Sequence, residues 1–324
     1  MSKAESTSVV CANSKYIERA AEILLAGGLV AFPTETVYGL GALATDDQAI
    51  SRLFSAKGRP AEHPVIVHIG SVDGLEGWGR SITQSAYDLA EAFWPGPLTL
   101  VVSRSPGVSD KVTGGQDTVG VRVPSHPVAQ DLLRSVGEAI AAPSANRFGR
   151  ISPTLAQHVF EDLDGKIDLI LDSGASKLGL ESTIIDVRGP RPRLLRPGLI
   201  SAEDVIGVLG TRPLPYDGAT TRAPGLLARH YAPNTPARLL SREEILMLEK
   251  GSRGLGVLSR ENSRTRFLGD WRVMPQDPIN YGEQLYANLR NLDREGIVEI
   301  LIENVPDEAA WAAIYDRLAR ATRR

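Results

Sequence analysis

Two cations separated by one glycine, Lys57 and Arg59, begin the stretch of this chain with the densest chemical content. A proline-containing turn follows, and then the apolar run 65–69, which carries one imidazole at His68. The run is short, rich in β-branched residues and apolar on both faces, so we predict a strand inside a sheet that is covered on both sides. Two cations at the mouth of a buried strand favour the binding of an anionic ligand at that edge of the sheet.

Hydroxyl, amide and cationic side chains also follow or end other predicted strands. In chain order they are Thr34, Thr36, Tyr38, Thr118, Ser144, Asn146, Ser152, Ser182 and Arg196. Cations combined with hydroxyls and amides are typical of phosphate-binding sites. For any single residue a turn or surface role is the more common explanation, whereas the recurrence at strand ends favours one shared ligand site.

Arg122 lies between valines on the predicted strand 119–123. A guanidinium inside an apolar strand is costly unless it is paired with an anion. Two partners fit this requirement, a structural carboxylate of the protein and the carboxylate of a ligand. The pattern by itself leaves both open.

Several common chemistries are excluded because their motifs are missing from the sequence. It contains no P-loop, no Gly-x-Gly-x-x-Gly dinucleotide fingerprint, no Gly-x-Ser-x-Gly elbow and no His-x-x-x-His pair. The single cysteine, Cys11, excludes an internal disulfide and a cysteine-based zinc cluster. The spacing of His63 and His68 is a poor match for one metal ion, and no metal ligands are assigned.

Composition indicates an ordinary globular chain. It has 324 residues, 42% apolar and 23% charged, which favours two domains. The net charge of −3 provides no general attraction for nucleic acid, so any anion site must be local. We find no signal-peptide pattern and no apolar window of about 18 residues, and therefore expect a cytoplasmic protein without a membrane span.

Helices and strands alternate along the first two thirds of the chain. We predict helices at 14–25, 45–57, 82–93 and 127–136, one starting at Ser152-Pro153, and one at 202–209 behind a Ser201 capping box. We predict strands at 29–32, 65–69, 98–102, 119–123, 139–142, 167–171, 182–187 and around 194–196.

A proline-rich connector at 211–236 precedes a second α/β pattern at 237–324. This second part reads as a strand from Ala237, a helix at 242–250, a strand at 255–258, a helix at 281–293, a strand at 298–302 and a helix at 307–322.

Four short segments of the chain together resemble the threonylcarbamoyl-AMP synthase family, which has the YrdC-like fold. They are Pro33-Thr34-Glu35-Thr36-Val37-Tyr38-Gly39-Leu40, Lys57-Gly58-Arg59-Pro60, Pro143-Ser144-Ala145-Asn146 and Ser152-Pro153-Thr154. The later His230-Tyr231-Ala232-Pro233 and the second α/β part are similar to the long, two-domain form of the family.

The resemblance implies an α/β fold with a large twisted mixed sheet, helices and a central concave site, plus a small Rossmann-like C-terminal domain. It implies a YrdC-like catalytic domain at 13–210, a linker or lid at 211–236 and the small domain at 237–324.

The activity that the resemblance implies is L-threonylcarbamoyladenylate synthase, a nucleotidyltransferase. It forms threonylcarbamoyl-AMP and pyrophosphate from L-threonine, bicarbonate or CO2, and ATP, with Mg2+ accompanying the nucleotide. The product would feed a transferase complex that modifies adenosine 37 of tRNA, without stable nucleic-acid binding by this chain itself.

By the same resemblance, residues around ATP are Lys57, Arg59, His63, Thr118, Ser144, Asn146, Ser152 and Arg196, and residues around threonine are Thr36, His68, Arg122, Ala142 and Ser182. Many family members have Asn where this chain has His63. Lys57 and Arg59 would be the catalytic cations. Arg122 would meet the threonine carboxylate, and a neutral His68 would keep a second positive charge away from the threonine amine.

The connector carries more side-chain chemistry than a spacer requires, in Arg229-His230-Tyr231 and Asn234. Its prolines keep it extended at little further entropic cost. We therefore predict a lid over the nucleotide with contacts from Tyr231 and Asn234, the alternative being a surface linker.

Three other functions remain open at this point. A double-stranded RNA-binding accessory is opposed by the net charge and by the lack of interleaved aromatic and basic residues. A carbamoyltransferase module of the hydrogenase-maturation type is opposed by the single cysteine, because those proteins carry cysteine-rich zinc fingers. A nucleotide-binding regulator without turnover would release no pyrophosphate.

Overall fold

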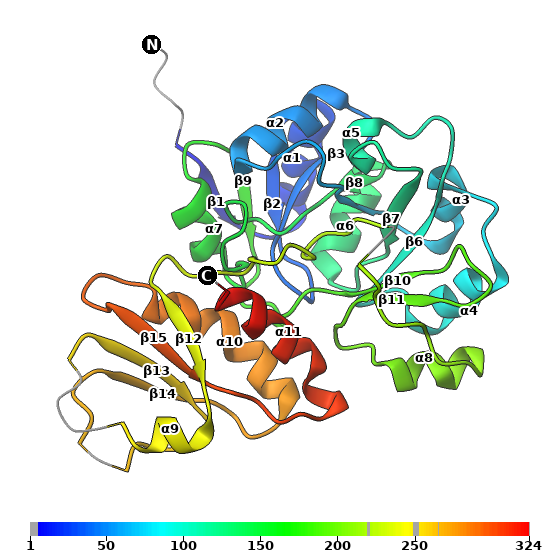
Figure 1. The fold of residues 1–324 in the computed structure, drawn as a ribbon. Coiled ribbons are helices and arrows are strands. Elements are labelled where there is room, and N and C mark those ends of the chain that lie inside the picture. Colours follow the sequence, from blue (N-terminus) through cyan, green and yellow to red (C-terminus); the bar gives the residue numbers. More distant parts are fainter. Residues whose placement is uncertain (1–5, 219–220, 249–252, 265, 324) are drawn as a thin grey trace. The chain divides into compact units, whose positions relative to one another are not determined.

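The computed structural model describes residues 6–218, 221–248, 253–264 and 266–323, and the statements below concern these residues. The chain forms two compact units, which we describe separately (Figure 1). The first unit comprises Met1–Phe148, Pro153–Ser176 and Glu181–Leu226, and the second comprises Gly149–Ser152, Lys177–Leu180 and Leu227–Arg324. Two short segments, Gly149–Ser152 and Lys177–Leu180, therefore belong to the second unit although most of that unit follows later in the chain.

The first unit is built on an eleven-stranded mixed sheet. Ten strands follow the order β1-β9-β2-β3-β8-β4-β7-β6-β10-β11, and β5 pairs with β6 beside this path. The strands are β1 (Ser8–Cys11), β2 (Val30–Phe32), β3 (Gly39–Leu43), β4 (Ile66–His68), β5 (Gly79–Arg80), β6 (Leu98–Arg104), β7 (Thr118–Arg122), β8 (Ile140–Ala141), β9 (Leu169–Asp172), β10 (Thr183–Asp186) and β11 (Arg193–Arg196).

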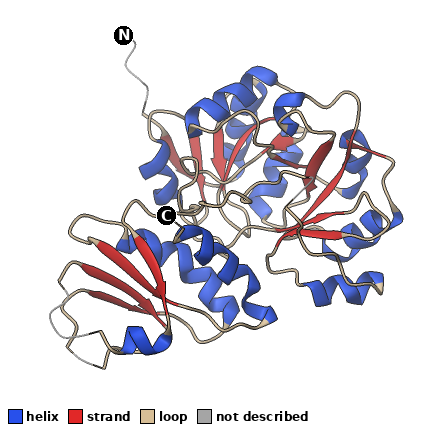
Figure 2. Cartoon of the chain, in the orientation of Figure 1, coloured by secondary structure: helices blue, strands red, loops and turns tan. Residues whose placement is uncertain are grey.

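Helices cover the sheet of the first unit on both faces, as Figure 2 shows. They are α1 (Ser14–Leu25), α2 (Asp47–Lys57), the 3-10 turn η1 (Val72–Gly74), α3 (Leu75–Trp78), α4 (Gln84–Phe93), α5 (Asp110–Thr113), α6 (Pro127–Val136), α7 (Ala156–Leu163) and α8 (Ala202–Leu209). One apolar cluster joins α1 and α6 to β2, β3, β8 and β9. A larger apolar cluster is built on other side chains of the strands and includes residues of α2, α4 and α7. Burial on both faces explains why the central strands read as continuous apolar runs.

Local signals set most helix ends as predicted. The Asn13 side chain caps α1, and the Ser201 capping box starts α8. The helix expected from Ser152-Pro153 begins only at Ala156, and this prediction was wrong by about one turn. The reason is tertiary: the Pro153 carbonyl accepts the Tyr38 N–H, and the Thr154 carbonyl accepts the Ser176 N–H, so neither is available to a helix.

The second unit contains a four-stranded parallel sheet in the order β12-β15-β13-β14. Its elements are β12 (Ala237–Leu240), α9 (Arg242–Leu246), β13 (Leu255–Ser259), β14 (Asp270–Val273), α10 (Pro278–Leu292), β15 (Glu299–Glu303), η2 (Ala309–Trp311) and α11 (Ala312–Ala321). The sequence pattern missed β14, in which three residues are half-buried and Val273 is exposed. The helix predicted to reach Lys250 ends at Leu246 among the described residues, and positions 249–252 lie outside them.

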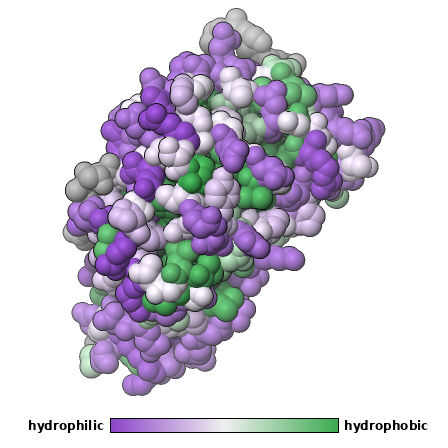
Figure 3. Space-filling model, turned by 90° about the vertical axis from the view of Figure 1, so that its right-hand side faces the viewer, coloured by the Kyte–Doolittle hydropathy of each residue, from purple (hydrophilic) through white to green (hydrophobic). Residues whose placement is uncertain are grey.

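The expected fold class is confirmed, with a large mixed sheet followed by a small parallel α/β unit. The compact units divide the expected connector at Leu226/Leu227. None of the described helices has the length and apolar composition needed to cross a membrane. On the face drawn in Figure 3, hydrophilic side chains cover most of the surface and hydrophobic ones form small patches between them.

Candidate active site

Lys57 is the last residue of α2 and its side chain is buried. Gly58 ends the helix in the left-handed conformation, with φ of 62°, and redirects the chain toward Arg59. The Lys57 ammonium donates to the carbonyl oxygens of Ser144 and Asn146 in the loop after β8. The structure therefore brings the Lys-x-Arg and Ser-x-Asn segments together, although the two hydrogen bonds join residues that are 87 and 89 positions apart in the sequence.

Burial lowers the pKa of Lys57 well below its usual range, and the positive charge of Arg59 lowers it further. The charge of Asp162 offsets this lowering only in part, so a buried ammonium here gains from a further anion placed beside it. The site is thus suited to a ligand that brings negative charge.

Arg59 is held by backbone carbonyls of the turn that it precedes. Its Nη2 donates to the Pro64 carbonyl at 2.6 Å, and its Nε donates to the His63 carbonyl at 3.3 Å. Its guanidinium lies 5.5 Å from the Phe148 ring centre, and the His63 ring lies 5.2 Å from the same ring. Partial burial and the charge of Arg59 lower the pKa of His63. Arg59, His63 and Phe148 therefore form one group beside Lys57.

Arg122 and His68 are placed side by side because β7 and β4 pair in parallel with these two residues in register. The Arg122 Nη2 donates to Glu35 Oε1 at 2.6 Å, its Nη1 to Thr36 Oγ1 at 3.0 Å, and its Nε to the Gly96 carbonyl at 3.1 Å. Burial alone would raise the pKa of Glu35, but the Arg122 charge and hydrogen bond outweigh it, and the pKa is lowered. A guanidinium has five N–H groups, so two of them remain for a ligand.

Of the two partners that the sequence left open for Arg122, the structure thus supplies the carboxylate of Glu35. Sequence reasoning did not single out Glu35. The available signal was its position as the one acidic residue in the segment 33–38 between β2 and β3, next to Thr36.

His68 is almost fully buried and packs edge-on against Phe32, with ring centres 6.3 Å apart. Burial, reinforced by the positive charge of Arg122 and partly offset by Glu35, lowers the pKa of His68 to about 3. The imidazole is therefore neutral at physiological pH. Ala142 lies on the same part of the sheet, where its N–H donates to the Ile66 carbonyl at 2.9 Å.

Ser182 and Arg196, which lie at β10 and β11 beyond β6 in the same sheet, are joined to each other. The Ser182 hydroxyl lies 2.8 Å from Thr99 Oγ1, and Arg196 donates to both the Ser182 carbonyl and the Ser182 hydroxyl. Arg196 Nη1 also donates to the Pro224 carbonyl at 3.0 Å. Thr99 is a further site residue that sequence reasoning missed, since a lone threonine in an apolar strand gives no distinct signal.

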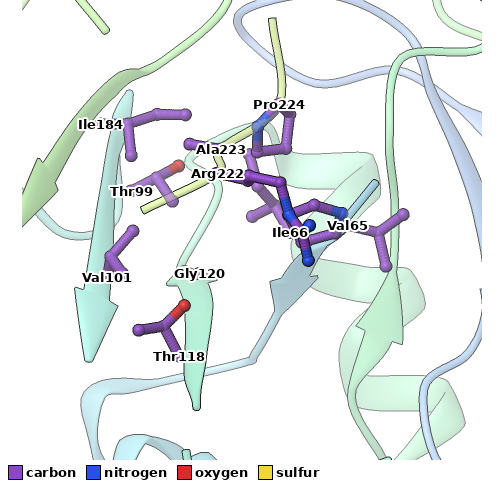
Figure 4. Close-up of a pocket in the computed structure, with 11 residues that line it drawn as sticks. Val65, Ile66, Thr99, Val101, Thr118, Gly120, Ile184, Arg222, Ala223 and Pro224 are labelled. Atoms are coloured by element: carbon purple, nitrogen blue, oxygen red, sulfur yellow. The ribbon is translucent and has the colours of Figure 1, made fainter. Parts of the chain in front are cut away.

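A small pocket lies on this side of the sheet, with Thr118 and Thr99 in its wall (Figure 4). Its lining comes from four strands, the turn before β4 and the first half of the connector. The lining residues are Pro64, Val65, Ile66, Thr99, Val101, Thr118, Gly120, Ile184, Arg222, Ala223 and Pro224. Ala223 packs in one apolar cluster with Ile66, Val101 and Ile184. Residues 222–224 of the connector therefore cover part of the sheet face that carries Thr118.

Three of the predicted ATP-binding residues belong to the second unit. Ser152 is fully buried there. Tyr231 is buried against Tyr286, at 5.9 Å between ring centres, and Asn234 donates to the carboxylate of Asp293. The proposed contacts of these residues with a nucleotide stay predictions.

Two family models match the chain. Residues 22–198 match the model described as "Telomere recombination", and residues 200–322 match the model described as "Threonylcarbamoyl-AMP synthase, C-terminal domain". The chain is 41% identical over 318 residues to the threonylcarbamoyl-AMP synthase of Pyrococcus abyssi, with 94% of each chain covered. It is 39% identical over 333 residues to that of Bacillus subtilis, with 97% of this chain and 95% of the relative covered.

Solved structures agree with these matches. The crystal structure of Pyrococcus abyssi Sua5 complexed with L-threonine superposes with a TM-score of 0.89 at 38% identity, covering 98% of this chain and 96% of that one. Matches of this identity extend over both units. The chain therefore belongs to the threonylcarbamoyl-AMP synthase family.

Proposed function

We propose that this protein forms L-threonylcarbamoyl-AMP and pyrophosphate from L-threonine, bicarbonate or CO2, and ATP, and that it is a nucleotidyltransferase. The observation that carries the proposal is that the first unit holds two groups of side chains with different chemical character. The buried Lys57 is joined to the Ser144–Asn146 loop, and Arg122 lies in register with a neutral His68. The first group suits phosphate and the second suits a carboxylate beside an amine.

Threonine would be held at the Arg122 end. The two remaining N–H groups of Arg122 would bind its carboxylate beside the Thr36 hydroxyl, and Ser182 is a further residue that we assign to threonine. The neutral His68 adds no positive charge beside the threonine amine, so the amine can lose its proton more readily. The neutral amine then attacks CO2, and loss of one proton gives the carbamate.

ATP would be held around Lys57, Arg59 and Arg196. The carbamate oxygen attacks the α-phosphorus, and pyrophosphate leaves from the opposite side. The protein positions the reactants and stabilises the developing negative charge, which requires no side-chain nucleophile. Thr118, Ser144, Asn146, Ser152 and His63 are the further residues that we assign to the nucleotide.

Mg2+ would enter with ATP, because this ion usually keeps several waters and binds substrate phosphates together with one or two carboxylates. The described part of the chain holds no group of three or more His, Cys, Asp or Glu side chains suited to a metal ion. We therefore assign no residue as its ligand.

We also propose that the product is passed to a transferase that modifies tRNA and that the protein is cytoplasmic. The connector would act as a lid that excludes water from the adenylate. Its residues 222–224 already line the pocket of the first unit, which supports a role near the site. A chain ending near Leu209, or one with His230 and Tyr231 both changed to Ala, should lose most synthase activity.

Mass spectrometry of the reaction of ATP, L-threonine and bicarbonate tests the proposed function. We expect the threonylcarbamoyl adenylate together with one pyrophosphate per product. Serine lacks one methyl group, so we expect its turnover to be reduced by ~10–200-fold. Equal turnover with unrelated amino acids, or ATP binding without pyrophosphate release, would contradict the proposal.

The Lys57→Ala variant tests the phosphate assignment. Loss of one electrostatic donor should lower turnover by roughly 10²–10³-fold. Lys166→Ala is the matched control, because Lys166 is exposed in the first unit. Unchanged kinetics of Lys57→Ala would refute the assignment.

A further inference from the structure

Asp293, directly after α10 in the second unit, accepts four hydrogen bonds from two successive connector residues. Its Oδ2 accepts the Asn234 N–H at 2.8 Å and the Asn234 side-chain amide at 2.9 Å. Its Oδ1 accepts the Thr235 N–H at 2.8 Å and the Thr235 hydroxyl at 2.9 Å. Hydrogen bonds to a carboxylate are stronger than neutral ones, so Asp293 fixes the end of the connector.

The residues just before this turn are bonded to the segment Gly149–Ser152, which belongs to the same unit. The Ala232 N–H donates to the Gly149 carbonyl at 3.0 Å, and Arg150 Nη1 donates to the Pro233 carbonyl at 3.2 Å. Arg150 and Ala232 form an isolated parallel bridge. The connector therefore holds this segment along one side.

Helix α10 holds the same segment through Arg290, which donates from Nη2 to the Ile151 carbonyl at 2.5 Å. Arg290 lies three residues before Asp293, about one helical turn away. One end of α10 thus provides both the anchor for the connector and a direct bond to the segment. The buried Ser152, which we assign to ATP, is the last residue of that segment.

We propose that Asp293 is a positioning residue for ATP: it fixes the Asn234-Thr235 turn, through which Ala232 and Pro233 hold the segment that carries Ser152. The inference rests on the proposed function for the identity of the nucleotide and for the assignment of Ser152 to it. It gives the second unit a specific task in the reaction, that of ordering the ATP-binding segment. Asp293 would act through these hydrogen bonds and not by contact with a substrate.

Asp293→Asn in the full-length protein is the sharpest test. The amide keeps the size of the side chain but replaces one accepting oxygen with an NH2 group that faces two of the four donors. Asp307→Asn is the matched control, because Asp307 is an exposed aspartate of the same unit. Thr235→Val removes one of the four donors to Asp293. It should weaken the binding of the ATP analogue less than Asp293→Asn does.

Two binding measurements and one exchange measurement read the result. We expect the dissociation constant of a non-hydrolysable ATP analogue, measured by calorimetry, to rise by roughly 10–100-fold, as for misplacement of a positioned group by about 1 Å. The dissociation constant of L-threonine should stay within about twofold. Amide hydrogen exchange should accelerate in peptides covering 149–152 and 230–235, while strands β13 and β15 keep their protection.

The outcomes separate this inference from the proposed function. Unchanged affinity for the ATP analogue in Asp293→Asn would overturn the inference, and so would equal weakening of ATP and threonine binding together with lost protection of β13 and β15. In active protein, KM for ATP should rise with KM for threonine unchanged. A wild-type protein that makes no adenylate would overturn the proposed function, whereas the binding and exchange measurements would still decide the role of Asp293.

Discussion

His68 should make the stability of the first unit depend on pH in a defined window. Its pKa is about 3 in the folded protein, against about 6.5 for an unperturbed histidine. Between these values the unfolded chain binds a proton at this position and the folded chain does not. Stability is therefore fully present above about pH 6.5 and is lost as the pH falls toward 3.

The size of the effect follows from the linkage relation. One proton taken up on unfolding changes the free energy of unfolding by about 1.36 kcal/mol per pH unit. Between a pH of about 6.5, the pKa of histidine in the unfolded chain, and pH 5, the contribution of His68 should lower the free energy of unfolding by about 2 kcal/mol. The cause is the loss of hydration of the charged ring and the nearby charge of Arg122, which Glu35 offsets only in part.

The assay compares wild type with His68→Gln, which keeps a polar side chain of similar size but does not titrate. Urea-dependent hydrogen exchange, read on peptides of β4 and β7, gives the free energy of unfolding at pH 7 and pH 5. The wild type should lose about 2 kcal/mol more than the variant over this interval. Equal pH dependence of the two proteins, or a His68 NMR titration with its midpoint near 6.5, would refute the reasoning.

Two other variants test the packing of the site by the same exchange measurement. Glu35→Gln removes the charge from a pair whose side chains are only 8% and 5% exposed, and it should destabilise the first unit by about 3–5 kcal/mol because Arg122 is left buried without its counter-charge. Asp131→Asn is the control in an exposed ion pair and should change stability by at most ~0.5 kcal/mol. An equal loss of stability in both variants would contradict this prediction. Gly58→Ala should destabilise the first unit by about 1 kcal/mol through backbone strain alone, since the residue has φ of 62° and an added Cβ would meet no atom within 4 Å. Gly77→Ala is the control, because this position is equally open and has no positive φ. Equal stability of the two variants would show that the end of α2 tolerates a side chain.

Local sequence signals determined most elements of the first unit. The Asn13 cap, the Ser201 capping box and the Gly58 terminus act within one helical turn, so neighbouring residues alone define them. The apolar runs of the central strands are also readable, because a sheet covered on both faces requires them. The late start of α7 was not readable, since it depends on hydrogen bonds from Tyr38 and Ser176.

The sequence also determined which residue types the site would use, and the family resemblance grouped them. Only the tertiary structure determined which of these side chains are hydrogen-bonded to one another. Arg122 clearly required an anion, but the choice of Glu35 depends on how the loop after β2 lies over β7. The anchor at Asp293 gave no signal in the sequence, because an aspartate after a helix is common and its four donors lie about 58 residues away along the chain. Such contacts arise from the packing of distant segments, which local periodicity and capping do not encode.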